Sequence, residues 1–434
     1  MRRAPTPLVG IVADDLTGAM DASGAFAAHG LTARVMPSPS VSPPETGSNH
    51  VLCYNTQTRD ADSAAVSQTV RKTTGLLLQQ GCARLYKKID STLRGHVGLE
   101  ILATLDASGA HTAFVCPAFP AMGRTVRTGV VFAGDKPVAR DRDTHSVVDL
   151  LEGQTGHGVG LVTLTDVERG EGGIEGRVEN LLAQDYRIVV LDAVNDRHLE
   201  NIATALENNH SEELVVGSAG LAYAVAAGMM KRGIGVVEKH PHRFLSGPFL
   251  LVSGSLSPVT QAQLRLAKQM DRLSLVPIDV AALLHSSSSA AGERARIMDA
   301  ARDAFARVDD VGLTWSDPDR VLASVTSPVR GRETAACLAA FLQSVTSSLV
   351  TETPMSGLIL VGGETAYSVL AGLRTEGIEL KDEIAPGIPM GILSGGKAGG
   401  RFVITKAGGF GDDSALATVI RHARSSGSGK SAPP

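Results

Sequence analysis

The stretch "LVGIVADDLTGAMD", residues 8–21, decides the fold class of this 434-residue chain. Its first six residues form a short apolar run, which predicts a buried β-strand over 8–13. Asp14 and Asp15 follow at once, and Thr17-Gly18 indicate the start of a helix. A strand that passes through a polar turn into a helix is the repeating unit of α/β proteins.

The same unit recurs along the whole chain. Short apolar runs rich in β-branched residues predict further strands at 50–56, 83–89, 112–118, 160–164, 187–193 and 213–218, and then at 248–255, 273–280, 357–363, 390–395 and 401–407. Segments with helical periodicity separate many of these runs. Because such alternation requires right-handed crossovers, the sequence predicts mainly parallel sheets flanked by helices.

Chain length and one polar segment predict two domains. Single hydrophobic cores usually stop growing at about 250–300 residues. The segment 233–248 is polar, contains two prolines and separates two alternating series. We therefore expect an N-terminal domain over 1–240 and a C-terminal domain over 245–423. The tail 424–434 is poor in apolar residues, and we expect it to be disordered.

Composition excludes several classes of protein. Aromatic residues make up 4% of the chain and the net charge is −4, so neither a base-stacking surface nor a basic field for nucleic acid is expected. No apolar run approaches the roughly 18 residues of a membrane helix, and the N-terminus lacks the apolar core of a signal peptide. Four widely spaced cysteines predict reduced, buried thiols in a cytoplasmic protein.

Polar residues gather where the first three predicted strands end. In open α/β sheets, ligands bind beyond the carboxyl ends of the strands. Arginine can hold a carboxylate with two parallel hydrogen bonds, and hydroxyl side chains suit a polyol. A small polyhydroxy acid fits such a set. The candidates for binding it are Asp14, Asp15, Arg59, Lys88, Asp90, Ser91, Thr92 and Arg94.

Plainer interpretations of these residues stay open at this stage. One aspartate of the pair after the first strand could simply cap the helix that follows. Arg59 could be a solvated surface residue. The segment "KKIDSTLRG", residues 87–95, could be a purely structural turn.

The second half of the chain has glycine-rich turns after three strands, in "LVSGSLSP" (251–258), "LILVGGETAYSVLAGL" (358–373) and "VITKAGGFGDD" (403–413). Glycine lets a phosphate group approach backbone N–H groups at a helix N-terminus. One such turn is common, but three in one domain favour a nucleotide site. The candidate cofactor-binding residues are Ser255, Ser257, Gly362, Gly363, Glu364, Thr365, Gly408 and Gly409.

Six segments together resemble the four-carbon acid sugar kinase family: "IVADDLTGAMD", "YKKIDSTLRG", "GSAGLA", "VSGSLSPVT", "VGGETA" and "TKAGGFGD". They follow the family's order over almost the whole chain. The resemblance implies an N-terminal sugar-acid domain, a C-terminal nucleotide-binding domain and an active site in the cleft between them. It also implies ATP and Mg²⁺ as cofactors, and phosphorylation of a tetronate, with the terminal hydroxyl as acceptor.

The branch of the family is indicated by "KKIDSTLRG", which is similar to the D-threonate and D-erythronate kinases. The 3-oxo-tetronate kinases usually carry a motif closer to "KYCSTFDST", and they are the alternative. One departure is His96, where the family usually has Asn after Arg-Gly. Further alternatives are a sugar-acid oxidoreductase, against which the missing G-x-G-x-x-G pattern argues, and a non-catalytic sugar-acid-binding protein.

The resemblance also implies roles for the candidate residues. Asp14 or Asp15, Arg59 and the run 90–94 would contact the acid, and the glycine-rich turns would contact ATP. A carboxylate near the substrate hydroxyl would accept its proton, and Asp15 and Asp90 are the two candidates. We favour Asp15, because the cations beside Asp90 should lower its pKa. The sequence assigns no metal ligand, and a homodimer is one expectation for the assembly.

Overall fold

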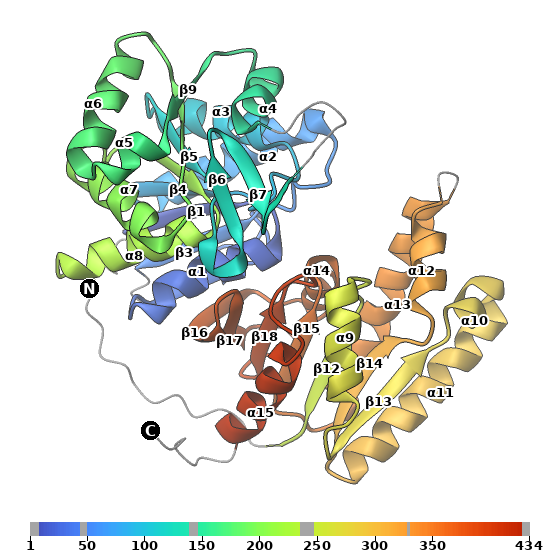
Figure 1. Ribbon diagram of the computed structural model, residues 1–434. Helices are drawn as coiled ribbons and strands as arrows, with labels where there is room; N and C mark the ends of the chain where they lie inside the picture. Colours follow the sequence, from blue (N-terminus) through green and yellow to red (C-terminus); the bar gives the residue numbers. More distant parts are fainter. Residues whose placement is uncertain (1–7, 44–49, 139–145, 235–246, 328–329, 428–434) are drawn as a thin grey trace. The chain divides into compact units, whose positions relative to one another are not determined.

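The computed structural model describes residues 8–43, 50–138, 146–234, 247–327 and 330–427. The chain forms two compact units, residues 1–239 and 240–434, and each is an α/β layer structure, as predicted. Figure 1 colours the first unit blue to green and the second yellow to red. The predicted boundary between 240 and 245 lies outside the described residues.

The N-terminal unit is built on a parallel sheet with the strand order β2-β3-β1-β4-β11-β5-β10-β9. These strands are β1 (Val9–Ala13), β2 (Ala33–Met36), β3 (Val51–Asn55), β4 (Arg84–Lys88), β5 (Ala113–Cys116), β9 (Val159–Val162), β10 (Ile188–Leu191) and β11 (Leu214–Gly217). Ala13 pairs with Asn55 on one side and with Lys88 on the other. The carboxyl ends of β1, β3 and β4 are therefore level with one another.

Helices cover both faces of this sheet (Figure 1). They are α1 (Leu16–Ala28), α2 (Ser63–Gln79), α3 (Val97–Ser108), α4 (Val147–Thr155), α5 (Leu164–Glu168), α6 (Glu171–Leu182), α7 (Asp196–Asn209) and α8 (Ala219–Lys231). Helix α1 packs against α8, and α2 packs against α3. Residues 16–27 of α1 are all buried, so the helix that follows the aspartate pair is a core element.

A small antiparallel sheet of β6 (Arg124–Arg127), β7 (Val130–Ala133) and β8 (Lys136–Pro137) follows β5 through the 3₁₀ turn Pro120–Met122. The carboxylate of Asp192 accepts hydrogen bonds from the backbone N–H groups of Thr128 and Gly129, which holds the β6–β7 turn. The sequence analysis did not predict this hairpin, because its strands are short and partly exposed.

The C-terminal unit has the strand order β13-β14-β12-β15-β18-β17-β16. Its strands are β12 (Phe249–Ser253), β13 (Leu273–Ile278), β14 (Asp310–Trp315), β15 (Gly357–Val361), β16 (Gly377–Ala385), β17 (Ile388–Ser394) and β18 (Phe402–Lys406). Strands β13, β14, β12, β15 and β18 are parallel. Strand β17 then pairs antiparallel with β18, and β16 pairs antiparallel with β17. The fold prediction of mainly parallel sheets is confirmed.

Helices of the C-terminal unit are α9 (Pro258–Ala267), α10 (Val280–His285), α11 (Ser287–Ala306), α12 (Pro318–Val325), α13 (Gly331–Glu352), α14 (Gly363–Gly372) and α15 (Ala415–Gly427). By length and composition alone, α13 could cross a membrane. It packs against α14, however, and one of its faces buries Leu342, Val345 and Leu349 in the core of this unit.

Two expectations from the sequence were wrong. The predicted disordered tail begins too early, because α15 continues to Gly427; Arg424 Nε donates to Asp310 Oδ2 at 2.7 Å and anchors the end of the helix. Residues 428–434 lie outside the described part of the chain. The cysteines are free thiols as expected, but Cys337 is exposed on α13 while the other three are buried.

Each predicted strand is present within a few residues of its expected position. Besides β6, β7 and β8, strands β2, β14 and β16 were missed. Strand β2 is four residues long, β14 begins with Asp310, and β16 carries four charged residues in "ELKDE". In these strands the polar residues interrupt the apolar runs on which the prediction rested.

Candidate functional site

The predicted substrate residues lie at one edge of the N-terminal sheet, where β1, β3 and β4 end. The chain leaves β1 towards β2 and β3 on one side, and later returns to β4 on the other. Strand β1 is therefore at a switch in strand order, which is where α/β sheets open a crevice for ligands. Asp14 and Asp15 follow β1, Arg59 follows β3, and Asp90 follows β4.

Arg59 joins these loops through its guanidinium group. Its Nε and Nη2 atoms donate to the two oxygens of Asp14 at 2.7 and 2.9 Å. Its Nη1 and Nη2 atoms donate to the two oxygens of Asp15 at 2.6 and 2.8 Å. Asp90 Oδ1 lies 3.8 Å from Nη1. Arg59 is thus largely buried between carboxylates, and the solvated alternative is excluded.

The two aspartates of the pair have different environments. Burial would raise the pKa of Asp14, but the charges of Arg59, Lys87 and Lys88 outweigh it and hold that pKa below its ordinary value. For Asp15, burial and the charge of Asp14 outweigh Arg59 and raise the pKa. Asp15 Oδ1 also accepts a hydrogen bond from Gly18 N at 2.8 Å, so it caps α1. The capping interpretation is correct for Asp15, and Asp14 has another role.

Asp90 is held by its own loop. Arg94 Nε and Nη2 donate to its two oxygens at 2.9 and 2.8 Å, and Thr92 donates from both its backbone and its hydroxyl. Burial would raise the pKa of Asp90, but hydrogen bonds from Arg94 and the charge of Arg59 lower it far more. The low pKa agrees with the expectation from sequence and makes Asp90 a poor proton acceptor.

Two residues in these loops have strained backbones. Gln57, just before Thr58-Arg59, has φ 51°, and Leu93, inside the loop that follows β4, has φ 62°. Side chains other than glycine rarely adopt this left-handed conformation, and such strain clusters at ligand sites. Two more predicted residues of this loop, Lys88 and Ser91, are buried. Lys88 Nζ donates to the carbonyl oxygen of Ile89 at 2.8 Å.

His96, the departure from the family pattern, bonds to the loop before α2. Its Nε2 atom donates to the carbonyl oxygen of Ala61 at 2.7 Å, in the loop before α2. The ring therefore ties the start of α3 to the loop after β3. Its role in the described chain is a contact between two loops.

A buried ion pair below the site was not predicted. Lys87 and Glu100 are both almost completely buried, and Lys87 Nζ lies 2.5 Å from Glu100 Oε2. The second oxygen of Glu100 accepts from Thr58 Oγ1 at 2.5 Å, and Lys87 also donates to the carbonyl oxygens of Val12 and Lys88. These bonds connect the ends of β1, β3 and β4 to the first turn of α3.

The signal for this pair was present in the sequence. Glu100 is the one charged residue in the otherwise apolar run "VGLEILATL", residues 97–105. A carboxylate on a buried helix face requires a cation or several donors. Lys87, on the buried strand β4, supplies that cation. The pair could not be assigned without knowing that α3 packs beside the end of β4.

We predict that Thr58→Val destabilises the protein by about 1–3 kcal/mol, because the variant keeps the shape but leaves a buried carboxylate oxygen without its donor. Thr58→Ser retains the hydroxyl and should cost less. Denaturant unfolding of the three proteins measures the difference.

A matched control is Thr74→Val on α2, where a buried hydroxyl donates to the carbonyl oxygen of Val70 within the helix. That carbonyl oxygen also accepts in the helical ladder, so the loss should be smaller. Equal losses for Thr58→Val and Thr74→Val would contradict the importance assigned to the carboxylate network.

In the C-terminal unit the three glycine-rich turns lie side by side, because they follow the neighbouring strands β12, β15 and β18. Gly362 has φ 107°, and its backbone N–H donates to the carbonyl oxygen of Lys406. A Cβ atom at Gly408 would clash with Ser255 Oγ. Thr260 Oγ1 donates to Gly408 O at 2.7 Å. The predicted residues Ser255, Gly362 and Gly408 are therefore brought together.

Two helices start at these turns without a capping side chain. Helix α9 begins after Ser257 and α14 begins after Gly362, and among the described residues neither of these two cap residues makes a side-chain capping hydrogen bond. The neighbouring helices α10, α11 and α12 are capped by Asp279, Ser286 and Asp317. Free N–H groups at a helix N-terminus, with the positive end of the helix dipole, favour an anion.

A wide depression lies at the carboxyl ends of β13 and β14. It has a volume of about 470 Å³, and its lining side chains include Glu293, Arg296 and Arg320. Trp315 at the end of β14 donates from its indole nitrogen to the carbonyl oxygen of Gly254, at 3.1 Å. This bond ties the end of β14 to the turn after β12.

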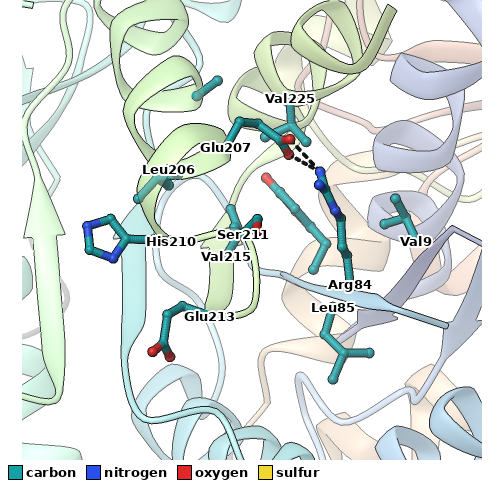
Figure 2. A pocket seen from close by; sticks show the side chains of 12 residues that line it. Val9, Arg84, Leu85, Leu206, Glu207, His210, Ser211, Glu213, Val215 and Val225 are labelled. Carbon is teal, nitrogen blue, oxygen red and sulfur yellow. Dashed lines mark hydrogen bonds and ion pairs between the residues drawn. The ribbon is translucent and has the colours of Figure 1, made fainter. Parts of the chain in front are cut away.

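A second cavity lies at the opposite edge of the N-terminal sheet, where Val9 and Arg84 begin their strands (Figure 2). Figure 2 shows the ion pair of Arg84 with Glu207 across it. The volume is about 20 Å³, which has room for little more than one water molecule. This cavity is too small for a sugar acid, so the aspartate edge is the candidate substrate site.

No group of three or more His, Cys, Asp or Glu side chains in the described ranges is arranged to hold a metal ion. This does not conflict with magnesium that arrives on a nucleotide. Mg²⁺ usually keeps several waters and takes its other ligands from phosphates and one or two carboxylates.

Comparison with family models divides the chain in the same places. Residues 9–225 match a model described as a sugar-binding N-terminal domain, and residues 250–416 match a nucleotide-binding C-terminal domain. The aspartates, Arg59 and the Asp90 loop fall in the first match. The three glycine-rich turns fall in the second.

Curated relatives are similar over nearly their whole length. A D-threonate kinase of Bordetella bronchiseptica is 33% identical over 96% of this chain and 98% of its own. A D-erythronate kinase of Heliobacterium modesticaldum is 29% identical over 94% and 95%. A 3-oxo-tetronate kinase of Salmonella typhimurium is 27% identical over 94% and 97%.

Solved structures share the fold at lower identity. A crystal structure of a Salmonella typhimurium LT2 protein has a TM-score of 0.80 at 23% identity and covers 95% of this chain and 99% of its own. A Haemophilus influenzae protein has a TM-score of 0.70 at 22% identity, over 96% and 100%.

Proposed function

The chain belongs to the four-carbon acid sugar kinase family, and we propose that it transfers the terminal phosphate of ATP to the terminal hydroxyl of D-threonate or D-erythronate. The observation that carries the proposal is the cluster of Asp14, Asp15, Arg59 and Asp90 at the switch point of the sheet. We further propose that the enzyme acts in the cytoplasm, where ATP is available.

The N-terminal cluster is suited to a polyhydroxy acid. Arg94 is the cation through which we propose the substrate carboxylate is bound, because its side chain is 59% exposed and its fork can hold a second carboxylate. Ser91 and Thr92 lie in the same loop and offer hydroxyl groups. Asp14 remains ionised and keeps Arg59 in place.

Asp15 is the proposed general base. Proton transfer is most efficient when the pKa of the base lies near the working pH, and the pKa of Asp15 is raised while those of Asp14 and Asp90 are lowered. Divergent environments of this kind separate a proton acceptor from carboxylates that only hold their neighbours. The acid limb of the pH–rate profile should follow Asp15, with activity lost as the pH falls through its raised pKa.

The C-terminal turns are the proposed ATP site. We infer that the phosphates lie against the N-termini of α9 and α14, with Ser255, Gly362 and Gly408 at the turns. We place the nucleoside towards the depression beside β13 and β14. ATP carries Mg²⁺ on its phosphates, and the ion would neutralise charge on the transferred group. The chain positions the two substrates and keeps the hydroxyl in line.

The direct test is an ADP-release assay with purified protein, ATP and a panel of four-carbon acids: D-threonate, D-erythronate, L-threonate and 3-oxo-tetronates. We expect turnover with D-threonate or D-erythronate, and none when the acid is omitted. Turnover restricted to the 3-oxo acids would establish the alternative kinase. NAD reduction with a tetronate would establish an oxidoreductase.

We predict that Asp15→Asn lowers kcat by at least about a hundredfold with a modest change in KM, because asparagine keeps the shape but does not accept the proton. Asp90→Asn should mainly raise the KM for the acid, because it releases Arg94 and Thr92. Steady-state kinetics of both variants separates the two roles. If Asp15→Asn keeps a near-normal kcat, the base is another group.

We predict that Gly409→Val raises the KM for ATP and leaves thermal stability almost unchanged. A Cβ atom at Gly409 meets nothing within 4 Å, so the fold has room for a side chain that a bound phosphate would not. The control is Gly292→Ala on α11, which also points into open space. A normal KM for ATP in Gly409→Val would remove this turn from the site.

A further inference from the structure

The buried lysines of the two units differ in whether a carboxylate lies beside them. In the N-terminal unit, Lys87 is buried against the carboxylate of Glu100, and Lys88 lies close enough to Asp14 and Asp15 to influence their pKa values. In the C-terminal unit, Lys406 is 1% exposed at the end of β18, and no carboxylate forms an ion pair with it within the ranges that the structure describes.

The only hydrogen bond that Lys406 makes in those ranges is from Nζ to the carbonyl oxygen of the next residue, Ala407, at 2.9 Å. An ammonium group has three donors, so this leaves its charge unneutralised and its hydrogen bonding incomplete. Burial without a counter-ion lowers the pKa of Lys406 to about 8. An uncompensated buried charge is costly, and proteins rarely retain one without a use.

The position of Lys406 suggests what the missing partner is. Its carbonyl oxygen accepts from Gly362 N, so the lysine lies between the turns after β15 and β18. The uncapped start of α14 follows Gly362, and the uncapped start of α9 is joined to the β18 turn by the bond from Thr260 to Gly408. Ser253 ends β12, on the other side of β15 from Lys406, and its Oγ atom is also buried without a hydrogen-bond partner among the described residues.

We propose that Lys406 is the counter-charge of the nucleotide phosphates, and that this ammonium stays buried and without a carboxylate partner until a phosphate binds. A phosphate group supplies negative charge and acceptor oxygens to Lys406, to Ser253 and to the two helix N-termini at once. The inference rests on the proposed ATP site, but it assigns a specific residue and a specific energetic role that the family resemblance did not.

The proposal has an unusual consequence for stability. If Lys406 served the fold, its replacement by an apolar residue would weaken the protein. If it is instead an uncompensated charge kept for a ligand, Lys406→Met should leave the unliganded protein as stable as the wild type or more stable, because methionine has similar length and no charge to bury. Binding of phosphate should be lost in the same variant.

The test compares wild type, Lys406→Met and Lys268→Met, without any sugar acid. Lys268 is exposed at the other end of α9, so its variant removes the same charge from the same unit. Thermal unfolding and calorimetric titrations with ADP, ATP and pyrophosphate are measured for each protein. We expect at least about a tenfold loss of affinity for all three ligands in Lys406→Met only, with no loss of thermal stability.

Each other outcome is decisive. Lower thermal stability with normal ligand affinity would make Lys406 a structural residue and overturn the proposal, while the kinase function would stand. If the wild type binds pyrophosphate but no nucleotide, and Lys406→Met loses it, the counter-charge role holds and the ATP assignment fails. If the wild type binds none of the three ligands, the proposal is overturned.

Discussion

The contact of Arg59 with Asp14 and Asp15 is the constraint on which the N-terminal site depends. Two adjacent carboxylates at the buried end of a strand repel each other and lose hydration, and both terms oppose ionisation. One guanidinium that donates to all four oxygens, helped by the charges of Lys87 and Lys88, reverses this balance for Asp14 and only partly for Asp15. The two carboxylates therefore differ, with the pKa of Asp14 lowered and that of Asp15 raised.

The rest of the N-terminal site serves to hold that guanidinium. Arg59 follows Thr58, whose hydroxyl is fixed by Glu100, and Glu100 is in turn paired with Lys87 beneath the loops. A fully buried ion pair contributes little net stability in most proteins, but removing one partner is expensive. Here the pair ties three strand ends to one helix. Its main effect is therefore to fix the positions of the loops that follow these strands, and its contribution to net stability is small.

The two units follow the same topological rule with opposite charge balance. Each places its functional loops where the strand order reverses, β1 in the first unit and β12 with β15 in the second. In the first, buried cations and carboxylates largely neutralise each other before any ligand arrives. In the second, Lys406 and two uncapped helix N-termini leave a positive region without a described counter-ion. A polyol that carries a single carboxylate suits the first environment, and a polyphosphate suits the second.

The amino-acid sequence alone determined the α/β class, the strands with continuous apolar runs and the identity of the loops that carry polar groups. These follow from local patterns, since apolar periodicity and glycine-rich turns are properties of neighbouring residues. Local pattern also identified Asp14, Asp15, Arg59 and the loop around Asp90. It failed for β2, β14 and β16, where polar residues interrupt the runs, and for the last turns of α15, which Asp310 holds from a distant strand.

Only the tertiary structure decided which polar groups are paired with one another and which are buried without a partner of opposite charge. Which aspartate is paired more tightly, which lysine has a carboxylate and which has none, and why Glu100 is buried at all depend on residues far apart in sequence. Burial and charge act through space, and a lysine beside a carboxylate has the same sequence signature as a lysine beside none. The difference between Lys87 and Lys406, and between Asp14 and Asp15, exists only once the strands are aligned and their ends brought together.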